Sequence, residues 1–569
     1  MTTLTEETGD TGDIGETGEH SAAWSDEDDW TRETLRLVRD LRTPHRRKRT
    51  GQIAYTVYCV ALILAVWGAL PSMGLFLEKS MGTDYSGHGP AILAALPAGS
   101  CALGLGWLLV AAWDAQWRGP VVPPRETVDW LLAQPVDVGR VLRPWFWGSA
   151  AISGGAGLLV SAIGMIALGL TVGVGLPAAF GWCLLGGIGL PLLATALGAA
   201  VEGSERVARW ARLATPYVAV ALLALVAQTV MAVRGDRLPG LERVELWSGP
   251  WGWAGLAALA PTPAALPGGW AAGVLLAVVV AGALAAAHRF VGSLALSAVR
   301  RRSRTATGVM AALRTVEFRT ARQAVAGVTG GGRSARWRLP APRWAEFAVP
   351  WRDALALLRT PGRLGRAVVL GVLAVLGAVL AASAHGGTGA AAALTSLAFG
   401  YWSLTQLLEP ARLETDDTRR GSWAPYPYRD LMLRHTSVPV VLGLVGALVA
   451  AGVLAGEGAG ARALLAPILV PPLVGASLVN ACRGATKHHL LMSSGQSPAG
   501  SLGPVLFLAW YGAGALAVVV MLVFPFLTAL HSGSAASIVT AVVASGMVTA
   551  ILVRWAVTRI GNLTAPLPD

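Results

Sequence analysis

The chain of 569 residues carries little charge. Asp, Glu, Lys and Arg together make up 14% of it, whereas apolar residues make up 54%. Its mean hydropathy is +0.55. A soluble globular domain carries about 25% charged residues, so this composition excludes a soluble globular protein and predicts a polytopic membrane protein.

Cysteine is scarce as well. The four cysteines are isolated, lie in or beside apolar runs, and form no CxxC or other metal-binding spacing. We interpret them as small buried apolar residues rather than metal ligands. They are Cys59, Cys101, Cys183 and Cys482.

The sequence also lacks a catalytic or cofactor-binding set of residues. No Ser/His/Asp set or carboxylate pair is placed for catalysis, and the adjacent His488 and His489 have no cysteine or carboxylate nearby. Residues 327–334 fit GxxxxG followed by a basic residue and Ser, but Arg333 replaces the Lys of a phosphate-binding loop, and the surrounding linker shows no strand pattern. We therefore expect no enzyme activity, no cofactor and no internal ATPase site.

Ionisable side chains are missing from the interior of the long apolar runs. The nearest ones fall at or beyond the ends of those runs: Asp114, Glu202, His288, His531 and Arg554. A carrier driven by a proton or sodium gradient usually holds such groups within its spans, although the backbone carbonyls of broken helices also bind sodium. This pattern disfavours an ion-coupled carrier and indicates an energy source outside the chain.

Long apolar runs are what the chain has in abundance. About twenty apolar residues cross a bilayer core, and the runs predict an all-α fold of about 12 transmembrane helices in two halves of six. The first half has spans at 53–75, 91–113, 146–168, 180–201, 213–233 and 269–288. The second half has spans at 367–383, 391–408, 438–454, 463–481, 504–527 and 536–553.

These runs divide the chain into five regions. Residues 1–29 are acidic and rich in Gly and Thr, so we expect them to be disordered, and they do not resemble a signal peptide. Residues 30–290 form the first six-span half, 291–345 a basic linker, 346–560 the second six-span half, and 561–569 a short C-terminal tail.

Basic residues are distributed unevenly over the loops. The basic run 45–49 precedes the first span and places the N-terminus in the cytoplasm. The later loops that this orientation places inside carry Arg118, Arg125, Arg140, Arg143, Arg206, Arg209, Arg212, Arg419, Arg420, Arg429, Arg434, Arg483 and Lys487. Those placed outside carry Lys79, Arg234, Arg237, Arg243 and Arg462. We therefore predict a multi-pass protein of the cell membrane with both termini in the cytoplasm, and we attribute the net charge of +12 to topology rather than to nucleic-acid binding.

The basic linker contains apolar residues at helical spacing, namely Val309, Leu313 and Val316, with Arg314 and Arg319 among them. This pattern is typical of a helix that lies on the anionic lipids of the inner leaflet. The alternative is a solvated basic linker that is not bound to the membrane surface or to the rest of the protein.

Two predicted cytoplasmic loops, each after the second span of a half, have a similar layout. In the first, a Gly/Pro turn precedes a short helix that ends in Leu-Leu-Ala-Gln-Pro at 131–135; in the second, residues 419–427 lead to Leu431 and Leu433. The candidate functional residues are Glu126, Asp129, Trp130, Leu132 and Pro135 in the first loop and Arg419, Arg420, Trp423, Pro427, Arg429 and Asp430 in the second.

The tetrapeptide Leu-Arg-Thr-Pro occurs twice, at 41–44 and 358–361, each time directly before the first span of a half. We interpret each copy as the end of an amphipathic helix, where Pro stops the helix and Arg anchors it at the membrane surface. The residues concerned are Arg42, Pro44, Arg359 and Pro361.

Together these features resemble the type-2 ABC exporter permeases, over most of residues 30–560. In that family a short coupling helix with an LLxxP turn docks on the ATPase. An amphipathic connecting helix, here residues 34–44 and 350–361, precedes the first span of each permease half. Residues 247–266 resemble the outer re-entrant helices of the family. The second half departs from the pattern because only residues 528–535 separate its last two spans, which puts a symmetric outer gate in doubt.

The resemblance implies a permease subunit of an ATP-driven exporter, energised through residues 126–135 and 419–430 by two copies of a separate ABC ATPase subunit. Two alternatives stay open: a secondary carrier or flippase, and a non-transporting membrane scaffold. A pathway lined by Ala, Gly, Val, Leu and Trp would suit lipids, peptides and hydrophobic natural products equally.

Overall fold

The computed structural model describes residues 31–38, 40, 86–314, 321, 324–325, 340–384, 386–416, 425–484, 496–497, 500–501 and 503–564. Over these residues the chain forms helices and turns, with one antiparallel pair of two-residue strands, β1 (Gln496–Ser497) and β2 (Gly500–Ser501). Ten of the described helices are long and apolar enough to cross a membrane. The protein is therefore a multi-pass helical membrane protein.

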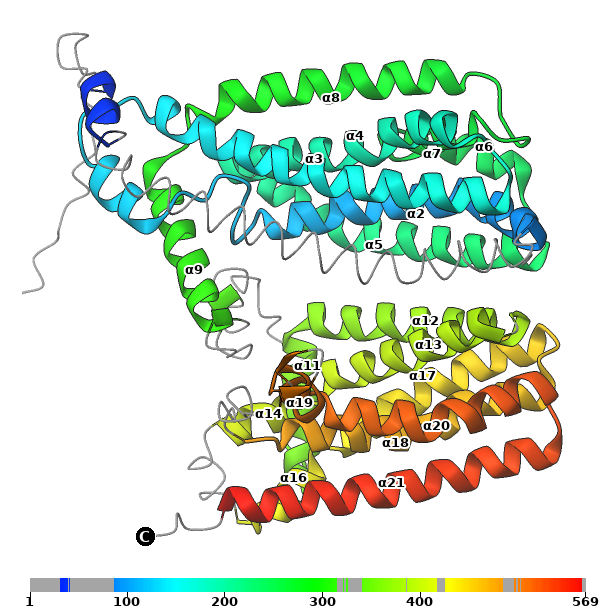
Figure 1. The fold of residues 1–569 in the computed structure, drawn as a ribbon. Helices are drawn as coiled ribbons and strands as arrows, with labels where there is room; N and C mark the ends of the chain where they lie inside the picture. Colours follow the sequence, from blue (N-terminus) through cyan, green and yellow to red (C-terminus); the bar gives the residue numbers. More distant parts are fainter. Residues whose placement is uncertain are drawn as a thin grey trace, which may run out of the picture.

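The helices between residues 86 and 314 pack into one group, drawn from blue to green in Figure 1. They are η2 (Ser86–His88), α2 (Gly89–Asp114), η3 (Thr127–Leu131), α3 (Val138–Thr171), α4 (Leu176–Gly203), α5 (Glu205–Arg234), α6 (Pro239–Trp247), α7 (Pro250–Leu259), α8 (Gly269–Val291) and α9 (Leu296–Arg314).

The helices between residues 345 and 564 pack into a second group, and α5 of the first group lies against α12 of the second. They are η4 (Ala345–Phe347), α11 (Ala348–Arg359), α12 (Pro361–Ser383), α13 (Gly386–Leu407), α14 (Glu409–Asp416), α16 (Tyr428–Arg434), α17 (Ser437–Gly456), η5 (Gly460–Leu464), α18 (Leu465–Ala481), α19 (Gly503–Tyr511), α20 (Ala513–Ser532) and α21 (Ala535–Thr564).

Successive long helices run in opposite directions, so their ends gather on two faces of the molecule (Figure 1). We call the face with α9, α11, α14 and α16 the linker end, and the face with α6 and α7 the far end. The described loops for which the sequence predicts a cytoplasmic location lie at the linker end.

The ten apolar helices coincide with ten of the predicted spans. The predicted span 53–75 lies outside the described residues, and the predicted span 391–408 forms α13, which contains several Gly, Ser and Thr and is not among the ten. The predicted span 504–527 was wrong at its start, because the chain breaks at Gly512 and leaves α19 as a separate short helix. Glycine is unfavourable inside a helix, which explains the position of the break.

Small residues allow helices of the first group to approach closely. A Cβ atom on Gly157 of α3 would overlap the carbonyl oxygen of Gly187 on α4. Beside this contact Ser161 Oγ donates hydrogen bonds to the carbonyl oxygens of Gly157 (2.8 Å) and Cys183 (3.2 Å). Close backbone approach and hydroxyl bonding between helices are typical of packing within a bilayer.

Each group has its own apolar core. In the second group the core centres on α18, where Leu478 and Val479 are fully buried against helices such as α21. In the first group a core at the linker end includes Leu142 and Phe146 of α3 and Val291 of α8. This core continues into the loop between α2 and α3, which contains the first predicted coupling segment.

Candidate functional site

The loop between α2 and α3 contains a short helix over residues 125–131 with one π-helical turn, followed by a turn over 132–135. We call residues 125–135 the first segment. Its inner side is apolar: Val128 and Leu132 are buried in the core formed by α3 and α8. Its outer side exposes Trp130, whose side chain is 77% exposed, and Glu126.

The remaining candidate residues of the first segment, Asp129 and Pro135, lie between its apolar inner side and its exposed outer side. Asp129 is half-buried and lies 3.3 Å from Arg125 Nε and 3.9 Å from a guanidinium nitrogen of Arg304 on α9. Pro135 is half-buried in the turn. The structure thus brings the five candidate residues of this loop together at the linker end, with an anchored inner side and an exposed aromatic and acidic outer side.

Two contacts that the sequence did not predict hold the C-terminal side of the first segment. Asp137 caps α3 by accepting a hydrogen bond from the Gly139 amide (2.8 Å), and its own amide donates to Thr31 Oγ1 (2.7 Å). Thr31 is fully buried and begins a helix over residues 31–38, from which Leu35 packs on the same core. An Asp directly before an apolar helix is a cap signal, so Asp137 could have been found from the sequence.

A buried ion pair holds the N-terminal side of the same loop. Glu202, at the end of α4, is 4% exposed and accepts a hydrogen bond from the Val121 amide (3.2 Å). Arg302 of α9 lies 3.7 Å from Glu202 Oε1 and donates to the Glu202 carbonyl oxygen (2.6 Å). Ser303 donates to the Pro123 carbonyl oxygen (3.0 Å). We call Gly119, Val121, Glu202, Arg302 and Ser303 the first junction.

Geometry and electrostatics make the first junction intolerant of change. Gly119 has φ of +75°, and a Cβ atom there would lie 2.5 Å from Glu202 Oε2. Burial lowers the pKa of the Arg302 guanidinium below its ordinary value, and the carboxylate of Glu202 opposes this shift. Removing one partner of a buried ion pair is strongly destabilising, so we expect the contacts among the loop, α4 and α9 to depend on both Glu202 and Arg302.

The linker helix α9 uses part of its predicted lipid-facing side for protein contacts. Val309 is buried and packs in a small cluster with Ala312, Ala321 and Trp117. The side chains of Leu313 and Val316 lie outside the described residues. Arg301 of α9 is exposed.

The second predicted loop is described from residue 425 onward, so Arg419, Arg420 and Trp423 lie outside the described residues. We call residues 425–434 the second segment. Pro427 directly precedes α16, and Arg429 and Asp430 are exposed on its first turn. Leu431 and Met432 are buried against the core around α18. This segment, like the first, has an exposed polar side and a buried apolar side.

Polar contacts join the second segment to the chain that precedes α11. The Tyr426 hydroxyl donates to the Ala345 carbonyl oxygen (2.7 Å), and Arg434 donates to the Glu346 carbonyl oxygen (2.9 Å). The Arg434 guanidinium also lies 4.2 Å from the centre of the Tyr426 ring. The sequence predicted residues 350–361 as a connecting helix but gave no signal for these contacts.

A charged cluster lies directly behind the second segment. His435 Nδ1 is 2.6 Å from Asp353 Oδ2, and both residues are 1% exposed. Arg352 lies 2.7 Å from a carboxylate oxygen of Glu414 on α14 and 3.3 Å from His435 Nε2. Because a guanidinium only donates, His435 Nε2 is the acceptor and Nδ1 carries the proton that it donates to Asp353. We call Arg352, Asp353, Glu414 and His435 the second junction.

The second copy of the Leu-Arg-Thr-Pro repeat lies between α11 and α12. Helix α11 ends at Arg359, Thr360 leaves the helical conformation (φ −121°, ψ 64°), and Pro361 is the first residue of α12. Thr360 Oγ1 donates to the Ala356 carbonyl oxygen (2.8 Å). Arg42 and Pro44, in the first copy, lie outside the described residues.

The two groups differ at the far end. In the first group, α6 and α7 lie between α5 and α8 along the chain, and Leu246 of α6 and Leu256 and Leu259 of α7 are buried in an apolar cluster. In the second group α20 and α21 are joined only by Gly533 and Ser534 (Figure 1). The shortened connection that the sequence predicted is thus a tight turn.

Within the described residues, no three His, Cys, Asp or Glu side chains are grouped so that they could hold a metal ion. Residues 327–334 and the histidines 488 and 489, for which the sequence disfavours a phosphate-binding loop and a metal site, lie outside the described part of the chain. The described linker end has two segments, each with a buried apolar side and an exposed outer side. Such an arrangement is suited to binding another macromolecule.

Comparison of the chain with models of protein families, with curated protein sequences and with solved structures finds no match.

Proposed function

We propose that the protein is the transmembrane permease subunit of an ATP-driven exporter, with two fused six-span halves energised by two copies of a separate ABC-type ATPase subunit. One observation carries this proposal: the first and second segments lie at the same end of the bundle, and each joins an exposed outer side to an apolar inner side continuous with the cores of the spans. A force applied to either outer side would therefore reach the spans directly.

Orientation follows from the basic loops. Those predicted to be cytoplasmic that the structure describes lie at the linker end, and the positive-inside rule assigns the more basic side to the cytoplasm, where ATP is available. In the cell membrane this would put both termini and both segments on the cytoplasmic side. The exposed Arg301 of α9 would then face the anionic lipids of the inner leaflet.

In the mechanism that we propose, closure of the ATPase pair pushes the two segments together, and the two helix groups rotate as rigid bodies about the contact between α5 and α12. The small residues on the helices permit such sliding at close range. A pathway between the groups lined by Ala, Gly, Val, Leu and Trp would suit a lipid, a peptide or a hydrophobic natural product.

The test is co-purification of the ATPase with a tagged full-length chain from its native membrane. Trp130→Ser should leave the fold intact, because the side chain is 77% exposed, but should reduce the recovered ATPase at least about tenfold, since exposed tryptophans are frequent binding hot spots. The matched control is Trp270→Ser, because Trp270 is 70% exposed on α8 at the far end.

Recovery of the wild-type chain without a stoichiometric ATPase would contradict the proposal, as would equal losses from both substitutions. Transport by the purified chain in liposomes, driven by an ion gradient alone, would instead establish a secondary carrier. Loss of partner recruitment on deletion of residues 1–29, with no ATPase bound to the intact chain, would establish a scaffold.

A further inference from the structure

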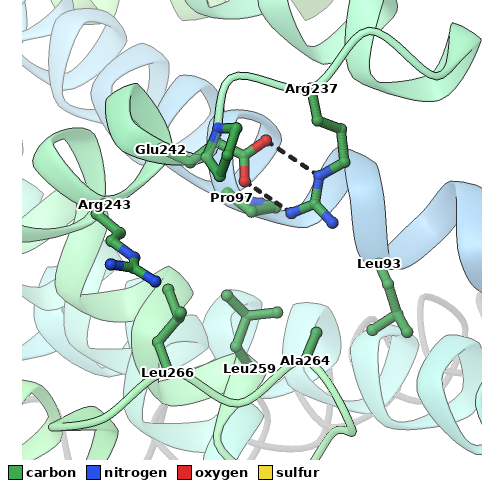
Figure 2. A pocket seen from close by; sticks show the side chains of 9 residues that line it. Leu93, Pro97, Arg237, Glu242, Arg243, Leu259, Ala264 and Leu266 are labelled. Carbon is green, nitrogen blue, oxygen red and sulfur yellow. Dashed lines mark hydrogen bonds and ion pairs between the residues drawn. The ribbon is translucent and has the colours of Figure 1, made fainter.

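A pocket lies beside α6 and α7 at the far end of the first group (Figure 1), and Figure 2 shows it from close by. Its volume of about 80 Å³ exceeds the roughly 10–15 Å³ that one ordered water needs and falls well below the roughly 300 Å³ of the smallest drug-sized sites. It therefore suits one end of a ligand rather than a whole large molecule. Its lining residues come from α2, α6, α7 and the loops that flank α6 and α7.

The floor of the pocket is apolar. Leu93 and Pro97 of α2 form one part of it, and Leu259, Ala264 and Leu266 form the rest, as Figure 2 shows. A fully hydrated ion would gain nothing from such a floor, whereas a short apolar group would gain about 25 cal/mol for each Å² it buries.

The rim of the pocket is cationic. Figure 2 shows the guanidinium groups of Arg237 and Arg243 on opposite sides of the opening. Glu242 is buried and fully engaged by Arg237, through contacts of 3.2 Å and 2.7 Å between the two side chains. The hydrogen bonds from Arg237 to Glu242 raise the pKa of Arg237 above its ordinary value.

Both arginines are exposed, but Arg243, unlike Arg237, has no ion-pair or hydrogen-bond partner in the part of the chain that the structure describes. The other carboxylate of α6, Glu245, accepts a hydrogen bond from Gln228 (3.0 Å) and does not line the pocket. With Glu242 neutralised by Arg237, the rim keeps one uncompensated positive charge. A guanidinium binds phosphate and carboxylate oxygens in a bidentate manner.

Exposed tryptophans indicate that the pocket lies near the level where a membrane meets water. Trp247 of α6 and Trp270 of α8 are exposed at the same end of the bundle, and tryptophans concentrate at the level of lipid head groups. A ligand that carries a charge at one end and an apolar chain at the other is abundant at this depth.

We propose that this pocket is a binding site for the anionic end of an amphiphile, in which Arg243 pairs with a phosphate or carboxylate and the floor of Leu93, Leu259 and Leu266 accepts the adjoining apolar carbons. The site lies at the opposite end from the segments assigned to the ATPase, so this inference does not depend on the proposed function. The same chemistry is offered by an anionic lipid of the surrounding leaflet and by a free amphiphilic anion.

Two probes distinguish these sources on the purified full-length chain. Butyl phosphate, compared with inorganic phosphate in calorimetric titrations, represents a free anion with a short apolar tail. Retention of phosphatidylglycerol against phosphatidylcholine, counted by native mass spectrometry, represents a lipid. Preference for butyl phosphate identifies a free amphiphile, retention of phosphatidylglycerol identifies a lipid, and either result supports the site.

The variants decide whether binding occurs in the pocket. Arg243→Gln should weaken binding at least about tenfold, the loss expected for one charge-assisted contact, and Ala264→Phe should block the pocket without changing its charge. Arg234→Gln is the matched control, because Arg234 is an exposed arginine at the end of α5 that does not line the pocket. Equal losses from Arg243→Gln and Arg234→Gln, unchanged binding to Ala264→Phe, or no binding to the wild-type chain would each overturn the proposal.

Discussion

The first and second junctions fasten their segments to the spans in different ways. In the first junction a single buried carboxyl group, Glu202, meets a single buried cation, Arg302, and the Val121 amide of the loop donates a hydrogen bond to the same carboxyl group. In the second junction the charge of Arg352 is shared among Asp353, Glu414 and His435, and Arg352 itself is half exposed.

This difference has a mechanical consequence. The loop residues that lead into the first segment are bonded to Glu202 of α4 and to Ser303 of α9, so we infer that the segment can tilt only if the Glu202–Arg302 pair moves with it. The second segment leads through His435 almost directly into α17, so a push on α16 is transmitted along a span. We infer that the first junction depends on one ion pair. In the second junction Arg352 has several partners, so the loss of one of them is partly compensated by the others.

The strongest test of this comparison is Arg302→Met. It removes the cation that faces the buried Glu202 side chain and takes the hydrogen-bond donor away from the Glu202 carbonyl oxygen, which should lower the free energy of unfolding by about 3 kcal/mol. The measurement is the unfolding midpoint of the chain in mixed micelles during titration with sodium dodecyl sulfate. Arg301→Met, one residue away and exposed, should change stability by less than about 0.5 kcal/mol.

The double variant Arg302→Met with Glu202→Gln makes the test sharper. It removes both charges, so it should recover a large part of the stability lost in Arg302→Met. If the double variant is no more stable than Arg302→Met, the loss arises from packing around the arginine stem and from the hydrogen bond to the Glu202 carbonyl oxygen, and the first junction does not depend on its ion pair.

A smaller effect is expected from Gly119→Ala. Alanine is strained at φ of +75°, and its Cβ atom would displace the Glu202 carboxylate from the Val121 amide, so the cost should be about 2 kcal/mol. The control is Gly362→Ala in the first turn of α12, where the added Cβ atom meets open space and stability should stay the same or rise slightly. Equal unfolding midpoints for the two variants in the same titration would show that the loop can move away from Glu202 at little cost in free energy.

The sequence revealed much of the fold and less of these junctions. Apolar run length located ten spans, and the Leu-Leu-Ala-Gln-Pro pattern located a short anchored helix, because run length and turn chemistry are local properties of the chain. It did not reveal the break at Gly512, since one glycine among apolar residues leaves the run uninterrupted. It placed Glu202 at a span end but could not pair it with Arg302, because the two residues are 100 positions apart and their contact depends on how α4 and α9 pack.

Glu414→Gln tests the second junction and should have the smallest effect on the free energy of unfolding. The substitution removes one carboxylate partner of Arg352, but that guanidinium is half exposed and keeps Asp353 and His435 within reach. Water can solvate the freed charge, so the free energy of unfolding should fall by about 1 kcal/mol or less in the same titration. Asp430→Asn, at an exposed acid on α16, serves as the control. A loss as large as that of Arg302→Met would mean that the second junction depends on one pair after all, and the inferred mechanical difference between the segments would disappear.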